Sequence, residues 1–286
     1  AYISFGVLHM ADNRFVWDEE DLIIEYPDKL LHNTKAKKNP KEAITEAAEA
    51  LAAIYVTGQD EIHDVILAAI SDGDLSHLQK DIKAIRADLL AQGKEWAGSE
   101  LPALYVAGAS QIAPPKAKGH QKAIAASVGL MTAKLREADA AIAKYADATI
   151  ARLRKLEAKG DLDGEDWLSD EYGDIEEELK DGIPAHKSIS GALLTLAPYA
   201  AMLAITASRD SYNEGVENSI LEAQDGSDLA QISEEVRPNS CEACREWAGT
   251  VISLHGLVEG YPTYDESVDA GIWHPSCIHF LQPFER

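Results

Sequence analysis

Apolar residues recur every three or four positions along most of the chain, a spacing that is typical of amphipathic helices. The pattern begins at Asn39-Pro40, where a helix-capping residue precedes a proline suited to the first helical position. Glycine and short polar stretches interrupt it, first at Gly58, and we interpret each interruption as the end of a helix. The pattern predicts helices over residues 39–58, 60–71, 75–91 and 100–112.

The segment 119–159 is the longest helical candidate. It contains no proline and one interior glycine, Gly129, and it is dominated by Ala, Lys, Arg and Glu, which are good helix formers. At about 1.5 Å per residue, such a helix would extend about 60 Å. We therefore expect an elongated helical body with a long central helix. The alternative is a pair of shorter helices that break at Gly129.

An acidic turn over residues 159–164 and a short acidic helix over residues 165–180 are expected next. The turn is similar to a calcium-binding loop, but Lys159 stands where the first carboxylate ligand belongs. We therefore interpret it as an acidic turn without calcium.

The stretch 188–208 carries no charge over about the length of a membrane span. It is rich in Ala, Ser, Thr and Gly, and Pro198 lies in its middle. Small residues suit a helix that is packed on all sides inside a protein. We therefore predict a buried core helix that starts at about residue 189, bends at Pro198 and ends near residue 226, rather than a membrane span.

After Gly226 the pattern changes from helical spacing to alternation. Residues 229–234 and 250–254 alternate apolar and polar positions as strands do, and Gly and Pro are frequent between and after them. The first residues of the chain show neither period. The chain is thus predicted to be mainly α, with an irregular N-terminal arm, a helical body and a small α+β C-terminal module. Their predicted ranges are 1–38, 39–226 and 227–286.

The net charge of −23 narrows the range of partners. A chain this acidic repels nucleic acid and anionic membrane surfaces. Its basic patches, at residues 35–38 and 116–118, are short and are interpreted as solvated loop charge. We predict no specific nucleic-acid partner and no membrane partner.

All three cysteines lie in the C-terminal module, in the pairs Cys241-x2-Cys244 and His274-x2-Cys277. Three cysteines cannot all pair within one chain, so their number favours a reducing compartment. Two intervening residues let both side chains of a pair reach one ion from a tight turn, and a second pair completes a tetrahedron. Mixed sulfur and nitrogen donors favour Zn²⁺. The spacing predicts that a structural zinc ion holds the module together through Cys241, Cys244, His274 and Cys277.

Other assignments of these side chains stay open. His279 competes with His274 for the fourth position, and His255 is a weaker rival because no second ligand lies near it in the sequence. The cysteines also suit a redox or disulfide pair, or plain buried thiols. Four ligands would fill the shell of a zinc ion, and the chain lacks a nucleophile elbow, a phosphate loop and a dinucleotide fingerprint. We therefore predict that it is not an enzyme.

Five blocks of the C-terminal module surround and include the two Cys/His pairs. They lie at 229–233, 238–244, 247–254, 260–264 and 271–279, the last reading Gly-Ile-Trp-His-Pro-Ser-Cys-Ile-His. In these blocks, which cover about the last sixty residues, the chain resembles the C-terminal part of minor capsid proteins of tailed bacteriophages. The resemblance is to the minor capsid protein 2 type, which is related to the Mu F-like head morphogenesis proteins, and Ile278 stands where that family usually has arginine.

The resemblance implies a structural head protein that is made in the bacterial cytoplasm and built into the virion. It implies a place in the capsid interior or at the portal vertex, with the portal protein and the major capsid protein as partners and several copies per virion. Enzymatic domains follow this block in longer relatives. Because this sequence ends at Arg286, we carry over no enzymatic activity.

Two other classes of function stay open at the level of the sequence. One is a metal-dependent nuclease or other hydrolase acting during infection, in which Glu242 or Glu246 would serve as the base if only three ligands bound the metal. The other is a cytoplasmic adaptor protein that zinc holds together and that has no place in the virion.

Overall fold

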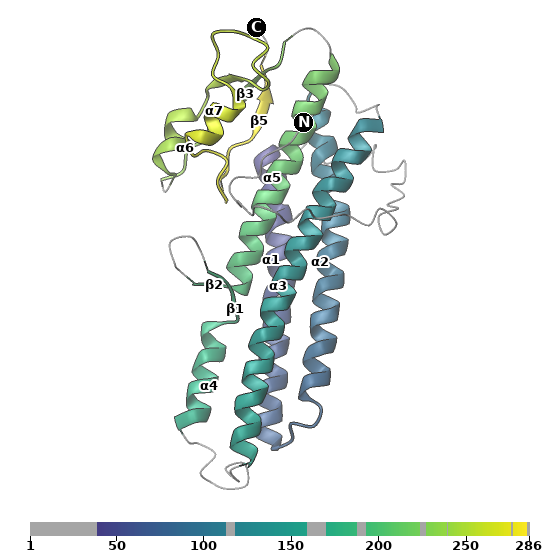
Figure 1. Ribbon diagram of the computed structural model, residues 1–286, viewed down its shortest axis with the longest axis vertical. Coiled ribbons are helices and arrows are strands. Elements are labelled where there is room, and N and C mark those ends of the chain that lie inside the picture. The colour runs from purple at the N-terminus through teal and green to yellow at the C-terminus, as the bar shows by residue number, and fades with distance from the viewer. Residues whose placement is uncertain are drawn as a thin grey trace, which may run out of the picture. The chain divides into compact units, whose positions relative to one another are not determined.

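The structure is a computed structural model that describes residues 39–112, 118–158, 170–187, 193–223, 227–238, 240–275 and 277–284. The described residues are mostly helical, one helix is very long, and the C-terminal part contains short strands (Figure 1). The predicted mainly α fold class is therefore confirmed. The predicted N-terminal arm and the acidic turn at 159–164 lie outside the described residues.

The helices and strands follow in the order of the chain. They are α1 (Pro40–Asp72), α2 (Leu78–Ala109), α3 (Lys118–Ala158), α4 (Asp170–Asp181), β1 (Pro184–Lys187), β2 (Leu193–Thr195), α5 (Leu196–Ala223), β3 (Leu229–Ile232), α6 (Glu242–Trp247), β4 (Val251–Ser253), α7 (Tyr264–Asp269) and β5 (Leu281–Pro283).

The chain folds into two compact units, and both are discontinuous in sequence. Unit 1 comprises Ala1–Ile44, Glu100–Val128 and Ile205–Arg286, and unit 2 comprises Thr45–Ser99 and Gly129–Ala204. Long helices thus contribute one part to each unit. The domain boundaries predicted at residues 38 and 226 stay predictions.

Unit 2 is built on packed stretches of α1, α2 and α3. The indole Nε1 of Trp96 donates to the carbonyl oxygen of Ala47 at 2.8 Å, which ties α2 to α1. The guanidinium of Arg86 donates two hydrogen bonds, of 2.8 and 2.9 Å, to the carboxylate of Asp139, which ties α2 to α3. Between them lies an apolar core, in which the larger fully buried residues are Leu51, Tyr55, Ile62, Ile66, Leu78, Leu135 and Ile142.

Two helix ends predicted from glycine and polar residues are wrong. α1 runs without a break through Gly58, and a Cβ at this position would overlap the side chain of Leu89 on α2. Gly58 therefore serves the packing of two helices rather than the end of one. α2 likewise joins the predicted helices 75–91 and 100–112 and includes Pro102. A proline inside a helix removes one backbone hydrogen bond, and the buried neighbours Leu101 and Leu104 anchor α2 there.

The predicted long helix and the predicted acidic helix are both present, as α3 and α4. α3 passes through Gly129 as one helix, so the alternative of two shorter helices is not realised. α4 begins at Asp170, later than predicted. It is followed by a short antiparallel hairpin of β1 and β2, in which Lys187 pairs with Leu193, and this hairpin was not predicted.

The apolar stretch at 188–208 differs from its prediction at its start. Residues 193–195 form β2, and α5 begins only at Leu196. Pro198 therefore lies in the first turn of α5, where backbone N–H groups have no partner within the helix, so the helix can contain it without bending. No helix among the described residues is both long enough and apolar enough to cross a membrane.

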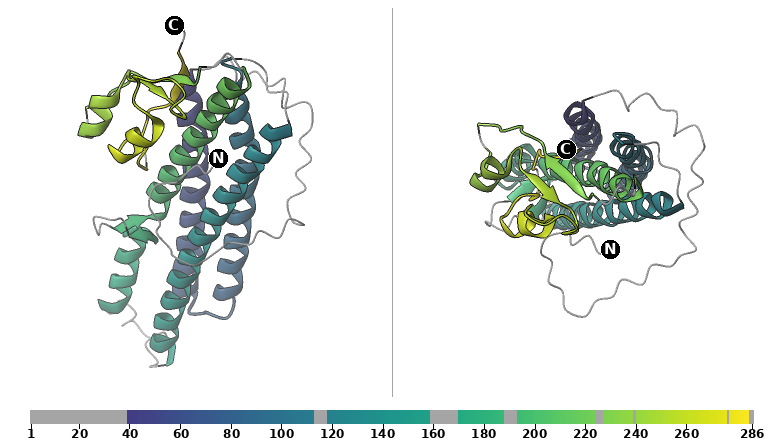
Figure 2. Two further views of the ribbon diagram at one scale, coloured as in Figure 1. Left: turned by 45° about the horizontal axis from the view of Figure 1, so that its top comes forward. Right: turned by 90° about the horizontal axis from the view of Figure 1, so that it is seen from above.

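In unit 1 the C-terminal segment forms a three-stranded antiparallel sheet with the order β4-β3-β5. Figure 2 shows this segment in yellow-green and yellow. Leu229 pairs with Ser253 of β4, and Ile232 pairs with Leu281 of β5. β3 and β4 fall within the two predicted strands, whereas β5, α6 and α7 were not predicted individually. The sheet brings both Cys/His pairs of the sequence into one small region, since α6 follows β3 and the second pair precedes β5.

Candidate metal centre

Helix α6 positions the first cysteine pair. Cys241 is its N-cap residue, with φ −67° and ψ 167°, and its Sγ accepts a hydrogen bond from the backbone N–H of Cys244 at 3.4 Å. The pair thus folds over the first turn of the helix, which directs both sulfur atoms to the same side. Cys244 is buried and Cys241 is exposed, so the pair spans the edge of the module.

The second pair lies on the loop 271–279. Gly271 and Trp273 both have positive φ, of 93° and 67°, and Trp273 is the sole non-glycine residue of this kind among the described residues. A turn follows in which the N–H of Cys277 donates to the carbonyl oxygen of His274 at 3.0 Å. The loop therefore reverses direction sharply, and this reversal turns His274 and Cys277 toward α6.

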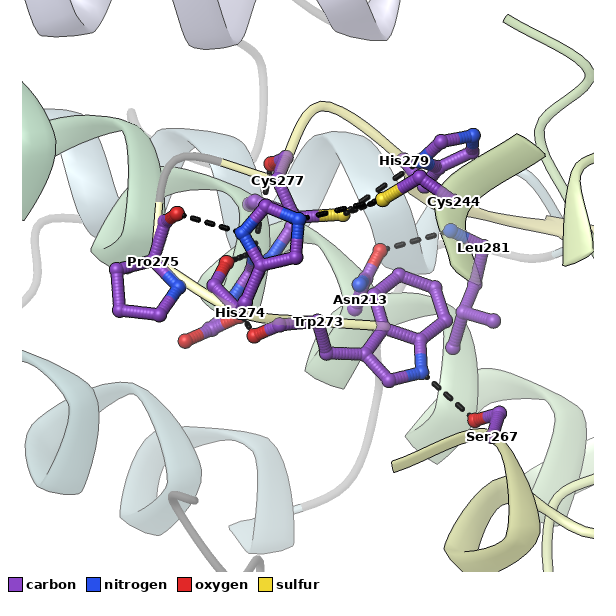
Figure 3. Close-up of polar contacts among 11 residues, drawn as sticks. Asn213, Cys244, Ser267, Trp273, His274, Pro275, Cys277, His279 and Leu281 are labelled. Carbon is purple, nitrogen blue, oxygen red and sulfur yellow. Dashed lines mark hydrogen bonds and ion pairs between the residues drawn. The ribbon is translucent and has the colours of Figure 1, made fainter. Parts of the chain in front are cut away.

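The donor atoms of the two pairs converge. The Nε2 atom of His274 lies 3.5 Å from the Sγ of Cys241 and 3.3 Å from the Sγ of Cys244. The sulfur atoms of Cys244 and Cys277 lie 3.7 Å apart, and Nδ1 of His279 lies 3.5 Å from the Sγ of Cys277. Figure 3 shows the sulfur atoms of Cys244 and Cys277 between the imidazole rings of His274 and His279.

These distances suit a tetrahedral metal ion. Zn–S and Zn–N bonds of about 2.3 and 2.1 Å give tetrahedron edges of about 3.8 Å between two sulfur atoms and about 3.6 Å between sulfur and nitrogen. The donors form two triads that share Cys244 and that can each bind a metal ion, and in each triad the ligand atoms lie within 4.8 Å of one another. The triads are Cys241–Cys244–His274 and Cys244–Cys277–His279.

The four predicted ligands all belong to this cluster, and so does the rival His279, which is fully buried. The choice of Cys241, Cys244, His274 and Cys277 as the ligand set stays a prediction. His255, the weaker rival, lies elsewhere: its Nε2 is 3.2 Å from a carboxylate oxygen of Glu217 on α5.

Electrostatics in the cluster favour a bound cation. Burial and the neighbouring Cys277 raise the pKa of the Cys244 thiol well above its ordinary value. A divalent cation reverses this effect because it stabilises the thiolate directly. Burial and the neighbouring His274 lower the pKa of His279, which keeps its imidazole neutral, as metal binding requires. The cluster is therefore chemically suited to a metal ion that accepts sulfur and nitrogen donors.

Sequence reasoning missed the residue that supports this cluster from α5. Arg209 is 2% exposed and donates hydrogen bonds to backbone carbonyls of the loop 271–279. In the sequence it appeared merely as a flank of the uncharged stretch 188–208. A charge placed directly after an apolar stretch is either solvated or paired in the interior, and the sequence alone does not distinguish the two.

Asn213, one turn further along α5, was also missed. Its Oδ1 accepts a hydrogen bond of 2.8 Å from the backbone N–H of Leu281, the first residue of β5. Arg209 and Asn213 together attach the loop and the strand that follows it to one helix.

No family model, curated protein or solved structure matches the chain.

Proposed function

We propose that the chain is a structural protein whose C-terminal module is stabilised by one zinc ion. The ligands in this proposal are Cys241, Cys244, His274 and Cys277. The observation that carries it is that three separations between donors of the two pairs match edges of a zinc tetrahedron, namely Cys241–His274, Cys244–His274 and Cys244–Cys277. A module of about sixty residues has a small apolar core, so a metal ion adds to the stability that this core supplies.

The proposed place of the protein is the head of a tailed bacteriophage, as a minor capsid protein. The support is the resemblance carried by the Cys/His blocks, above all residues 271–279. The net charge of −23 favours contacts with protein over contacts with packaged DNA. The portal protein and the major capsid protein are the proposed partners, in several copies per virion. No catalytic role is proposed, because four ligands leave a zinc ion no open position for a substrate or water.

Quantitative mass spectrometry of density-purified phage particles tests this role, with the portal protein as the internal copy-number standard. We expect a fixed, low ratio of this protein to portal. Particles that carry Cys277→Ser should lose the protein, whereas particles with Glu242→Gln, an exposed change between the two α6 cysteines, should keep it. Absence of the unaltered protein from purified particles would overturn the virion role, and a nuclease assay of the zinc-loaded protein would follow.

A further inference from the structure

We propose that Arg209 is the positioning residue of the metal centre. Its guanidinium fixes the backbone at Trp273, His274 and Cys277, so that His274 and Cys277 face Cys241 and Cys244 before the metal binds. The proposal rests on the zinc site described above and adds to it a residue that binds no metal itself.

The hydrogen bonds of Arg209 carry the inference. Nη1 donates to the carbonyl oxygens of His274 and Cys277, at 3.0 and 3.3 Å. Nη2 donates to the carbonyl oxygen of Trp273 at 3.2 Å. One rigid guanidinium therefore contacts the backbone of both loop ligands and of the residue before them. A planar fork with several donors can do this, whereas a lysine ammonium places all its donors on one nitrogen.

The charge of Arg209 is compensated inside the protein. The guanidinium is almost fully buried, and its Nε donates to Oδ1 of the adjacent Asp210 at 2.7 Å. A buried cation is tolerated when it is paired and hydrogen-bonded. Asp210 supplies the opposite charge and also accepts a hydrogen bond from Nη2, and the loop carbonyls accept the others. The guanidinium is thus held from the side of α5, and this makes it a fixed support for the loop.

The loop needs such support because its backbone is strained. Trp273 has φ 67°, a conformation that residues with a Cβ rarely adopt. Strained backbone persists only where the surroundings determine it strongly. The indole Nε1 of Trp273 donates to Oγ of Ser267 at 2.8 Å (Figure 3). The ring of Trp273 also stacks on Tyr264, with centroids 5.7 Å apart. Arg209 adds to these side-chain contacts a hydrogen bond to the backbone carbonyl oxygen of Trp273.

Support of this kind changes metal affinity without a contact to the metal. A loop that is already in the bound geometry does not have to be ordered when the ion binds. Outer partners that orient ligands commonly change affinity by about 10- to 100-fold. Loss of the guanidinium should leave all the donor atoms in the chain but weaken and distort the site they form.

The test compares the full-length protein with Arg209→Met and Arg209→Lys. Zinc affinity is measured by competition with a chromophoric chelator, and the ligand geometry is read from the visible spectrum of the Co²⁺-loaded protein. We expect Arg209→Met to bind Zn²⁺ at least about tenfold more weakly, with altered Co²⁺ ligand-field bands. Arg209→Lys, which keeps the positive charge beside Asp210, should fall between this variant and the unaltered protein.

The matched control is Arg86→Met in unit 2. It removes a guanidinium that makes two hydrogen bonds to Asp139 within unit 2. The zinc affinity of this variant should stay within about twofold of that of the unaltered protein. Its Co²⁺ spectrum should be unchanged.

The outcomes separate this inference from the proposed zinc site. If the unaltered protein binds no Zn²⁺, the zinc site itself is wrong. If it binds Zn²⁺ and a folded Arg209→Met retains the same affinity and spectrum, the positioning role is overturned and the site stands. Should Arg209→Met fail to fold, Arg209→Lys decides, and an affinity and spectrum equal to those of the unaltered protein would overturn the role.

Discussion

Glu214 is a largely buried carboxyl group on α5, one turn away from two other carboxylates of the same helix. Burial, with the negative charges of Glu217 and Asp210, raises the pKa of Glu214 from its ordinary 4.5 to about 7. The folded state therefore binds a proton more tightly than the unfolded state does. The stability contributed by this proton is fully present below about pH 4.5 and is lost as the pH rises through about 7.

The predicted consequence is that the contribution of Glu214 to stability falls between pH 5 and pH 8. One pKa unit corresponds to about 1.4 kcal/mol, so Glu214 accounts for about 2–3 kcal/mol of the fall in the free energy of unfolding. Glu214→Gln, which is neutral at every pH, should remove this part of the fall in urea unfolding experiments. Glu259→Gln, at an exposed position, should leave the pH dependence as it is. Parallel pH curves for the unaltered protein and Glu214→Gln would contradict the prediction.

At the scale of elements, α2 and α5 meet backbone to backbone within unit 1. A Cβ on Gly108 would overlap the carbonyl oxygen of Tyr212, and a Cβ on Gly215 would overlap the carbonyl oxygen of Tyr105. Two glycines therefore set the distance between the helices. Close by, Ser211 Oγ donates to the carbonyl oxygen of Leu101 at 2.8 Å, which adds a hydrogen bond across the same interface.

We predict that Gly108→Ala destabilises unit 1, because the helices must move apart or shift to admit the methyl group. Overpacking of this kind costs about 1–3 kcal/mol. The control is Gly98→Ala in the same helix, where a Cβ would meet no atom within 4 Å. This control should stabilise the protein by about 0.5–1 kcal/mol, because alanine favours a helix over glycine. Thermal unfolding followed by circular dichroism measures both, and equal effects of the two changes would show that the close approach is not required.

At the scale of the whole molecule, the metal centre and the packed helices of unit 2 draw their stability from different sources. The sheet and loops of residues 227–284 depend on the proposed zinc ion, whereas unit 2 depends on buried apolar side chains of long helices. Removal of the metal should therefore act on one part of the chain first.

The prediction is that a zinc chelator speeds proteolytic cleavage within residues 227–284 by about tenfold or more, because the metal-free segment opens more often. Cleavage within residues 78–99 and 129–158 of unit 2 should keep its rate. Limited proteolysis followed by mass spectrometry measures both, and added Zn²⁺ should restore protection. Cys277→Ser should behave like the chelated protein. Uniform cleavage of both regions after chelation would show that the metal does not stabilise the module selectively.

The sequence by itself determined the features that depend on local spacing. The recurrence of apolar residues every three or four positions indicated the helices, because such residues line the buried side of successive helical turns. The two-residue spacing within each Cys/His pair likewise indicated the metal cluster. Each pair is a local unit, and the structure brings both pairs together with donors 3.3 to 3.7 Å apart.

The tertiary structure alone decided the features that depend on a distant partner. Gly58 lies inside α1, where the side chain of Leu89 on α2 occupies the space that a Cβ would need. The sequence of α1 does not reveal this contact. Arg209 supports the metal loop through residues 64 to 68 positions away, and it could not be told apart from a solvated flank by its neighbours in sequence. The sequence named His279 as a rival of His274, and the structure includes both histidines in the cluster, in two triads that share Cys244. The physical reason is that the pattern of apolar and polar residues around a position indicates whether it is buried. Which residues it contacts depends on the segments that the fold places beside it.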